Sequence, residues 1–362
     1  MIGDRPALLL AALACTASAC GGGDAATAPT TSAAATTTPT VVDWPDEPVT
    51  EEAAFISGDF EVVGDLILPG GEGPYPAVIV VAGSGAQTRT SSPTYNTVRE
   101  AFGDAGFAVL SWDKPGSGES TGEFTEGNGL RERAAILHDG LQFLATDPHI
   151  DPHRIGFWGV SQAGWVMPLA LEAGANAAFM ISVSGGAEDS IEQMAYQISE
   201  QLACNGVPRE QAELAEQWGP QAAKGETYAL YTEAMEVLLT VPGMDQFIGT
   251  EMATEDDWQP WPPEIDAYFD PITVLETTTI PVLAVFGELD KNIDPIQGAD
   301  AYQRALTAAG NPDFHVEVIP GVGHTMLGQQ TGCIGERGSA PSARYADLIR
   351  EWADKLAGLP VG

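Results

Sequence analysis

Apolar and amphipathic stretches alternate along the first half of the chain. Short, nearly continuous apolar runs are typical of strands buried on both faces, and the stretches between them repeat with helical periodicity. The expected strands are 77–82, 107–112, 154–158 and 177–183, and the expected helices are 94–105, 130–145 and 162–173. This alternation predicts an α/β fold with a mostly parallel sheet that is covered by helices on both faces.

The sheet is expected to extend in both directions from this alternating region. Phe55 to Pro69 predicts an antiparallel edge hairpin that turns at Gly58-Asp59. Residues 281–286 and 314–319 have the pattern of two later strands, and Ser342 to Ala357 that of a closing helix. We find no internal repeat.

The pattern changes to polar helices between residues 186 and 275. Three helices are expected there, at Ile191 to Leu202, Arg209 to Trp218 and Tyr228 to Leu239. We interpret 186–275 as a helical cap inserted into a core of 51–185 and 276–362. The aromatic residues at 258–269 fit either a substrate wall or the packing of the cap on its base.

The stretch from Gly159 to Gly164, Gly-Val-Ser-Gln-Ala-Gly, has the pattern of a nucleophile elbow. A strand leads into it and a helix follows, as that sharp turn requires. Gly159 and Ala163 are small, which the turn needs because the backbones two residues on either side of Ser161 nearly touch. The helix start also places partial positive charge behind Ser161. Ser161 is therefore the candidate nucleophile.

Candidate acid and base residues follow Ser161 in the chain order of this catalytic arrangement. Asp290 comes directly after the strand 281–286, and His324 lies in the glycine-rich loop after 314–319. Carboxyl ends of parallel strands meet at one edge of a sheet, so the three side chains are expected to come together. Asp290 would fix the tautomer of His324, and His324 would accept the Ser161 proton.

A glycine-rich loop after the strand 77–82 is the candidate oxyanion loop. Its backbone N–H groups and the N–H after the nucleophile can hold a developing oxyanion. We assign these donors to Ser84 and Gln162, with Gly85 as the alternative to Ser84. The loop is not a dinucleotide fingerprint, because Thr88 stands where the third glycine would be.

Together these motifs resemble the α/β-hydrolase superfamily, and within it the bacterial serine esterases related to the dienelactone hydrolase and prolyl-oligopeptidase branches. The resemblance rests on the elbow, on residues 82–87 and 113–120, and on the segments that end in Asp290 and His324. It covers residues 53–185 and 276–355, and it implies a cap after the strand 177–183. The chain departs from the common pattern at Ala82, where a histidine is usual, and at Ala163, where a second elbow glycine is usual.

Two other groups of side chains have residue types that bind metals, and neither is assigned a metal. Asp147, His149, Asp151 and His153 lie in a proline-containing loop at the amino end of a strand, where an ordinary loop role is favoured. Residues 290–301 begin like a calcium loop, but Pro295 and Ala301 occupy the positions of the required glycine and glutamate. No cofactor is expected.

The amino terminus predicts export. A short apolar run at 7–13 and the sequence Ala17-Ser18-Ala19-Cys20 favour a signal peptide over 1–19 and a lipid on Cys20. An ordinary secretory signal is the alternative. Residues 20–50 are rich in Thr, Ala and Pro, and we expect a flexible tether. The expected location is therefore the cell surface, as a lipoprotein, or else secretion in soluble form.

The charge is strongly unbalanced. The chain has 51 acidic and 15 basic residues and a net charge of −36. Such a field disfavours nucleic acid and anionic substrates, so a neutral small-molecule substrate is expected. The charge is also suited to a salty or alkaline habitat. The oligomeric state is not indicated.

The four cysteines predict one disulfide. Cys15 would leave with the signal peptide and Cys20 would carry the lipid, which leaves Cys204 and Cys333. An oxidising compartment favours a bond between them, with two buried free thiols as the alternative. The bond would tie the cap to the loop that carries His324.

These features predict a serine hydrolase that cleaves carboxylic esters through an acyl-enzyme. A serine peptidase or aminopeptidase would use the same residues on amides. A binding protein that is lipid-anchored and has lost its chemistry is the alternative outside the enzymes.

Overall fold

The computed structural model describes residues 42–124, 129–259 and 266–358. The expected signal peptide, Cys20 and most of the expected tether lie outside these residues, as does the proline-rich part of the aromatic stretch, 260–265. Every helix within the described ranges is too short or too polar to span a lipid bilayer.

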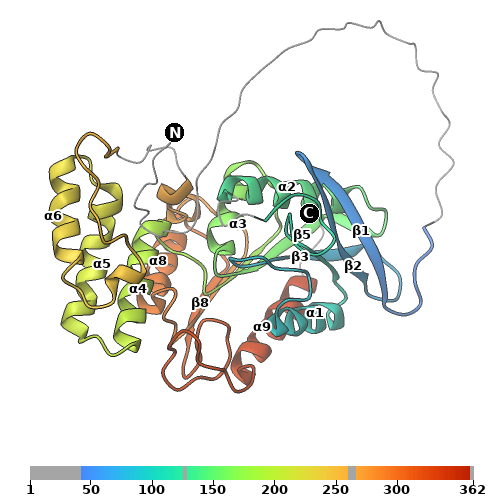
Figure 1. Ribbon diagram of the computed structural model, residues 1–362. Coiled ribbons are helices and arrows are strands. Elements are labelled where there is room, and N and C mark those ends of the chain that lie inside the picture. The colour runs from blue at the N-terminus through green and yellow to red at the C-terminus, as the bar shows by residue number, and fades with distance from the viewer. Residues whose placement is uncertain (1–41, 125–128, 260–265, 359–362) are drawn as a thin grey trace, which may run out of the picture.

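One eight-stranded sheet organises the core (Figure 1). Its spatial order is β1-β2-β4-β3-β5-β6-β7-β8. The hairpin β1–β2 is antiparallel and β2 pairs antiparallel with β4, whereas all later neighbours are parallel. The strands are β1 Val49–Ser57, β2 Phe60–Leu68, β3 Tyr75–Val81, β4 Ala108–Trp112, β5 Ile150–Val160, β6 Met180–Val183, β7 Val282–Gly287 and β8 Phe314–Ile319.

Helices cover both faces of this sheet, as the alternating pattern predicts. Alternate side chains of β3 point to opposite faces: Ile79 joins the core under α2, α3 and α8, and Val78 joins the core over α1 and α9. Figure 1 shows α1 and α9 on one side of the sheet and α2 and α3 on the other. These helices are α1 Pro93–Asp104, α2 Leu130–Ala145, α3 Ala163–Glu172, α8 Pro295–Ala308 and α9 Ala343–Ala357.

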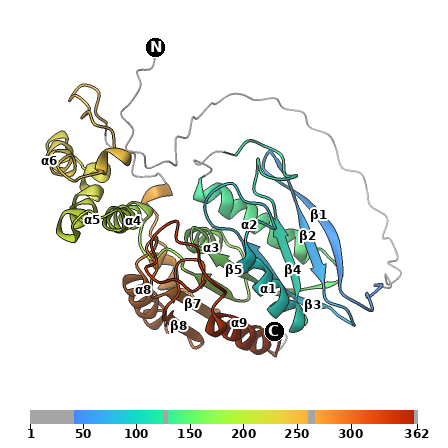
Figure 2. The same ribbon diagram turned by 60° about the horizontal axis from the view of Figure 1, so that its bottom comes forward.

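Three helices between β6 and β7 form a separate cluster beside the core (Figures 1 and 2). They are α4 Ser190–Cys204, α5 Arg209–Lys224 and α6 Tyr228–Leu238, followed by short 3₁₀ helices at Met244–Gln246 and Asp266–Tyr268 and by α7 Ile272–Leu275. The cluster has its own small apolar core, which includes Leu202, Ala212 and Met235. Trp258 packs against Tyr228 and Tyr231 there, so this aromatic residue serves the packing of the insertion.

The structure differs from the sequence expectations in a few boundaries. The hairpin begins at Val49, and Trp44 packs edge-on against Tyr75 and His149, so the segment that precedes the core is ordered earlier than residue 51. Strand β5 is longer than 154–158 and β6 is shorter than 177–183. Helix α8 is an element that the sequence analysis did not assign. Asp294 caps it by accepting the N–H groups of Ile296 and Gln297, which is a standard helix start.

Candidate active site

Ser161 lies at the carboxyl end of β5, on a sharp turn into α3. Its φ angle is 59°, an uncommon left-handed conformation for a residue with a side chain. The turn has no room for larger neighbours: a Cβ on Gly159 would lie 2.5 Å from the Cβ of Ala163. The Ser161 N–H donates to Val183 O at 2.9 Å, which ties the turn to β6. This is the geometry of a nucleophile elbow.

Asp290 and His324 meet at the carboxyl ends of β7 and β8. The His324 Nδ1 atom lies 3.1 Å and 2.9 Å from the two carboxylate oxygens of Asp290. The Asp290 side chain is fully buried, and its Oδ1 atom also accepts the N–H groups of Asn292 and Ile293. Because a carboxylate only accepts, Nδ1 carries the proton and Nε2 is left as the proton acceptor.

The loops that carry these two residues are packed tightly together. A Cβ on Gly287, at the end of β7, would lie 2.5 Å from Gly323 O, next to His324. No hydrogen bond joins Ser161 Oγ to His324 among the described residues. Catalytic hydrogen bonds often tighten only when substrate is bound, so the geometry is compatible with the predicted triad.

The candidate oxyanion loop approaches Ser161 from the end of β3. A Cβ on Gly83 would lie 3.3 Å from both the Cβ of Ser161 and the Val160 carbonyl oxygen. The peptide group that joins Gly83 to Ser84 is therefore next to the nucleophile, which favours the Ser84 N–H over that of Gly85. Gln162, the other candidate donor, is the first residue after Ser161 and precedes α3.

Helix α4 contacts the loop that carries Asp290. Its Tyr196 hydroxyl donates to the carbonyl oxygen of Asp290 at 3.0 Å. One turn further on, Glu200 forms an ion pair with Lys291 at 2.6 Å. Burial, followed by the nearby carboxylates, raises the pKa of Tyr196, which keeps this hydroxyl protonated as a donor. Sequence reasoning missed these contacts, because nothing local in a polar helix indicates which loop it will meet.

A disulfide joins the end of the same helix to the loop that follows His324. The bond links Cys204 to Cys333 across a sequence separation of 129 residues, with 5.8 Å between the Cα atoms. The pairing predicted from the cysteine count is therefore present. It connects the helical insertion to the segment that carries the candidate base.

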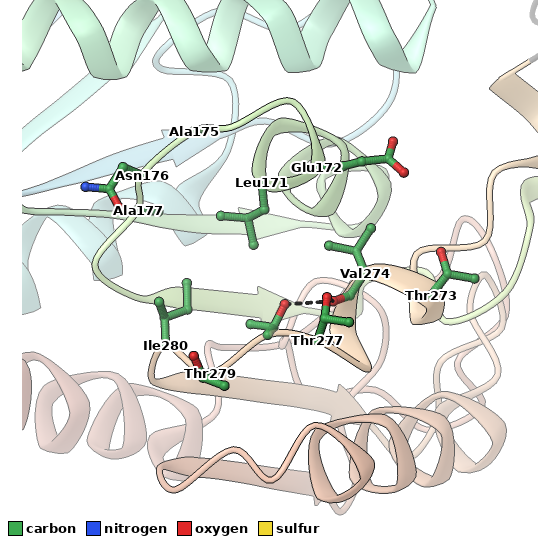
Figure 3. Close-up of a pocket in the computed structure, with 11 residues that line it drawn as sticks. Leu171, Glu172, Ala175, Asn176, Ala177, Thr273, Val274, Thr277, Thr279 and Ile280 are labelled. Atoms are coloured by element: carbon green, nitrogen blue, oxygen red, sulfur yellow. Dashed lines mark hydrogen bonds between the residues drawn. The ribbon is translucent and has the colours of Figure 1, made fainter.

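A cavity of about 460 Å³ lies elsewhere, at the amino ends of β6 and β7 (Figure 3). It is lined by the end of α3, the segment 175–177, Thr273, Val274 and the segment 277–280. Ser161 follows the opposite, carboxyl end of its strand. This cavity is therefore not the candidate active site.

Of the four residues with metal-binding side chains, Asp147 and His149 lie in a loop, whereas Asp151 and His153 belong to β5, which begins earlier than expected. His149 contacts the Asp147 carboxylate at 2.9 Å through Nδ1 and the Asp43 carbonyl at 3.1 Å through Nε2. The Nδ1 contact stabilises the loop itself, and the Nε2 contact holds the segment before β1 to this loop, as the ordinary loop role implies.

Acidic side chains lie close to the elbow helix. Glu188 follows β6, and its carbonyl oxygen accepts the indole N–H of Trp165 on α3. Burial, and then the neighbouring carboxylates of Glu192 and Asp189, raise the pKa of Glu188 to about 7. Glu188 therefore lies in a partly buried group of carboxylates beside α3.

Comparisons with known proteins agree with this architecture. The family model described as X-Pro dipeptidyl-peptidase (S15 family) matches residues 58–328, which is more than half of the chain. A thiohydrolase, aneE, of Aspergillus aculeatus is 32% identical over 118 residues, covering 32% of this chain and 36% of that protein. The esterase FrsA of Klebsiella pneumoniae is 31% identical over 105 residues, covering 29% of this chain and 23% of that protein. The chain thus spans about a third or less of the length of these curated relatives.

A solved structure gives the same result for the fold. The acylaminoacyl peptidase of Pyrococcus horikoshii superposes with a TM-score of 0.53 at 17% identity, covering 87% of this chain and 43% of that one. At this identity the likeness concerns the fold alone. The chain has the α/β-hydrolase fold and belongs to the S15 family.

Proposed function

We propose that this protein hydrolyses carboxylic esters through an acyl-enzyme, with Ser161 as nucleophile, His324 as general base and Asp290 as the residue that orients the base. The observation that carries the proposal is the buried Asp290–His324 pair, at the same sheet edge as a serine with a φ of 59°. The N–H groups of Ser84 and Gln162 are the proposed oxyanion donors.

The proposed reaction has two similar halves. His324 Nε2 takes the Ser161 hydroxyl proton as Oγ attacks the ester carbonyl, and it then delivers that proton to the departing alcohol. Water next attacks the acyl-enzyme with His324 again as the base. The acid is released, and the proton returns to Ser161. The buried Asp290 carboxylate stabilises the imidazolium in both halves because it lies against Nδ1.

A peptidase is the second candidate function, and the S15 family match favours it. The same triad cleaves amides, so the two functions differ in the leaving group and not in the catalytic residues. The relatives with named activities include a thiohydrolase and an esterase, which supports an acyl-transfer site whose leaving group is not restricted to amines.

A fluorophosphonate probe followed by a substrate panel tests the proposal. An active serine hydrolase should be labelled on Ser161, as peptide mapping would show, whereas a protein that only binds ligand would not be labelled. Purified protein should then turn over short nitrophenyl esters much faster than aminoacyl or X-Pro anilides. If the anilides were turned over faster than the esters, the esterase proposal would be wrong and the peptidase function would replace it.

The charge of the substrate should matter. We expect matched neutral esters to have roughly tenfold higher kcat/KM than anionic esters at low ionic strength, because the net charge of −36 repels anions. The difference should shrink towards 1 M salt, where the Debye length is about 3 Å. Equal rates for both esters at low salt would show that the surface charge does not reach the site.

We also propose that the protein is exported and anchored by a lipid on Cys20. The Cys204–Cys333 disulfide supports export, because such bonds persist in oxidising compartments. Metabolic labelling with a palmitate analogue should mark the wild-type protein in the membrane fraction, and Cys20→Ser should remove the label and release the protein. An unlabelled wild-type protein in the medium would favour the ordinary secretory signal.

A further inference from the structure

The oxyanion loop is held from behind by side chains. Four consecutive backbone carbonyls, those of residues 82–85, each accept a hydrogen bond from a side-chain donor of another residue. The pairs are Arg133 Nη2 with Ala82 O at 2.5 Å, Lys114 Nζ with Gly83 O and with Gly85 O (the latter at 2.9 Å), and Gln87 Nε2 with Ser84 O. Two of the three donor residues are cations.

These bonds determine where the N–H groups of the loop point. A trans peptide is planar, and its C=O and N–H point in opposite directions. Lys114 holds the Gly83 carbonyl on its own side, so the Ser84 N–H of the same peptide is turned away from Lys114. Gly83 lies against Ser161, and a donor in this position suits an oxyanion formed there.

Arg133 links this loop to the nucleophile turn. One nitrogen of its guanidinium donates to Ala82 O and the other donates to the side-chain oxygen of Gln162. The two segments proposed to supply the oxyanion donors are therefore joined by a single rigid, planar group from helix α2. Such a fork fixes the separation of its two partners better than a flexible point charge does.

The environment of Arg133 is unfavourable for a positive charge, because burial removes the side chain from water. Burial lowers the pKa of Arg133 to about 10, and the nearby Tyr95 partly opposes that effect. Within the described part of the chain, Arg133 forms no ion pair with any carboxylate, although the protein has 51 acidic residues. The charge remains at neutral pH and is directed at the backbone around Ser161.

Lys114 is held in place by the rest of its own motif. The preceding residue, Asp113, is buried. Its carboxylate accepts hydrogen bonds from the backbone N–H groups of Arg89 and Glu119, and it forms an ion pair with the Arg89 side chain at 2.7 Å. Lys114 is itself buried, with 6% of its surface exposed. The motif 113–120 therefore has a defined role, because it presents an ammonium group to the back of the oxyanion loop.

We propose that Arg133 and Lys114 are positioning residues for the oxyanion hole, which hold the carbonyls of Ala82, Gly83 and Gly85 away from Ser161 and keep the Ser84 and Gln162 N–H groups at a fixed separation. The inference rests on the proposed function. Their positive charges also lie behind the loop that borders the place where negative charge develops, which strengthens stabilisation of the transition state over that of bound substrate.

Substitutions at both positions test the inference by their effect on kcat. Arg133→Met and Lys114→Met should each lower kcat about 10- to 100-fold, less than the loss of a direct oxyanion donor, with KM changed less than about threefold. Affinity for a boronic acid, which forms a tetrahedral anionic adduct, should fall in parallel with kcat. Affinity for the neutral product alcohol should not change. A purely structural role would lower both affinities or only the folded fraction.

Matched variants separate these effects from net charge and from folding. Arg304→Met removes one cation from an exposed position of α8 and should leave kcat unchanged. Gln162→Met keeps the backbone N–H but removes the partner of Arg133, and it should lower kcat several-fold even if the Arg133 variant unfolds. Arg133→Lys should recover part of the lost rate, since it keeps the charge but cannot reach both partners.

The outcomes also distinguish this inference from the proposed function. If Ser161→Ala abolishes turnover while folded Arg133→Met, Lys114→Met and Gln162→Met all keep kcat within about twofold, the inference is wrong and the proposed mechanism stands. If Ser161→Ala retains turnover, the proposed mechanism itself is wrong.

Discussion

Replacing Ser161 with alanine is expected to lower kcat for ester hydrolysis by about 10⁶-fold, to the level that binding and the oxyanion donors alone provide. The hydroxyl is the only group that forms the acyl bond, so no neighbouring side chain can replace it. Steady-state kinetics on a nitrophenyl ester, with labelling by fluorophosphonate as a second measurement, checks the result.

Ser184 provides a matched control for this substitution. It also follows a strand end and has a positive φ, 46°, but it is completely buried at the end of β6. Ser184→Ala should therefore keep kcat within a few-fold of the wild type. Turnover by Ser161→Ala at the wild-type rate would disprove the proposed nucleophile.

The second large effect is expected at Asp290. Asp290→Asn should lower kcat by about 10⁴-fold, because an amide cannot hold Nδ1–H in the same way and the imidazole then presents the wrong tautomer to Ser161. The backbone bonds from Asn292 and Ile293 to Oδ1 can persist, so the loop should keep its conformation. His324→Ala should be about as severe as Ser161→Ala, since it removes the base itself.

Asp294→Asn is the control for this prediction. Asp294 caps helix α8 four residues further on, and asparagine is an equally good cap, so kcat and thermal stability should both stay near wild type. A pH profile of kcat/KM gives a further measurement. The rise of kcat/KM on the acidic side of the profile reports deprotonation of the base, and this rise should be lost or displaced in Asp290→Asn. A wild-type rate and profile would exclude Asp290 as the orienting acid.

The order of strands and helices could be predicted from the sequence because each of these elements has a local pattern. The buried strands are continuous apolar runs, as in β3, and the elbow needs small residues at fixed spacing around Ser161. The pairing of Cys204 with Cys333 followed from counting, since only two cysteines remained after the amino-terminal ones were assigned. These inferences needed no knowledge of distant contacts.

What the sequence did not reveal depends on residues that are far apart. Arg133 lies 29 residues before Gln162 and 51 after Ala82, and its place in an amphipathic helix looks like that of any half-buried arginine. The start of helix α8, Asp294-Pro295, lies within residues 290–301, whose pattern also resembles the beginning of a calcium loop, so that the local pattern is ambiguous. The early start of β1 is not evident in the sequence because its first four residues, Val49 to Glu52, are exposed and three of them are polar.

Helix α4 has a consequence for how substrate can reach Ser161. Its side chain at Tyr196 holds the acid loop, and its last residue, Cys204, is covalently joined to the loop after the base. A swing of α4 away from the core would therefore pull on Asp290 and His324 together, and opening in that manner would separate the residues of the proposed triad. On the proposed mechanism, substrate and product would pass beside parts of the insertion other than α4, and a ligand that displaces α4 would abolish turnover without contacting Ser161.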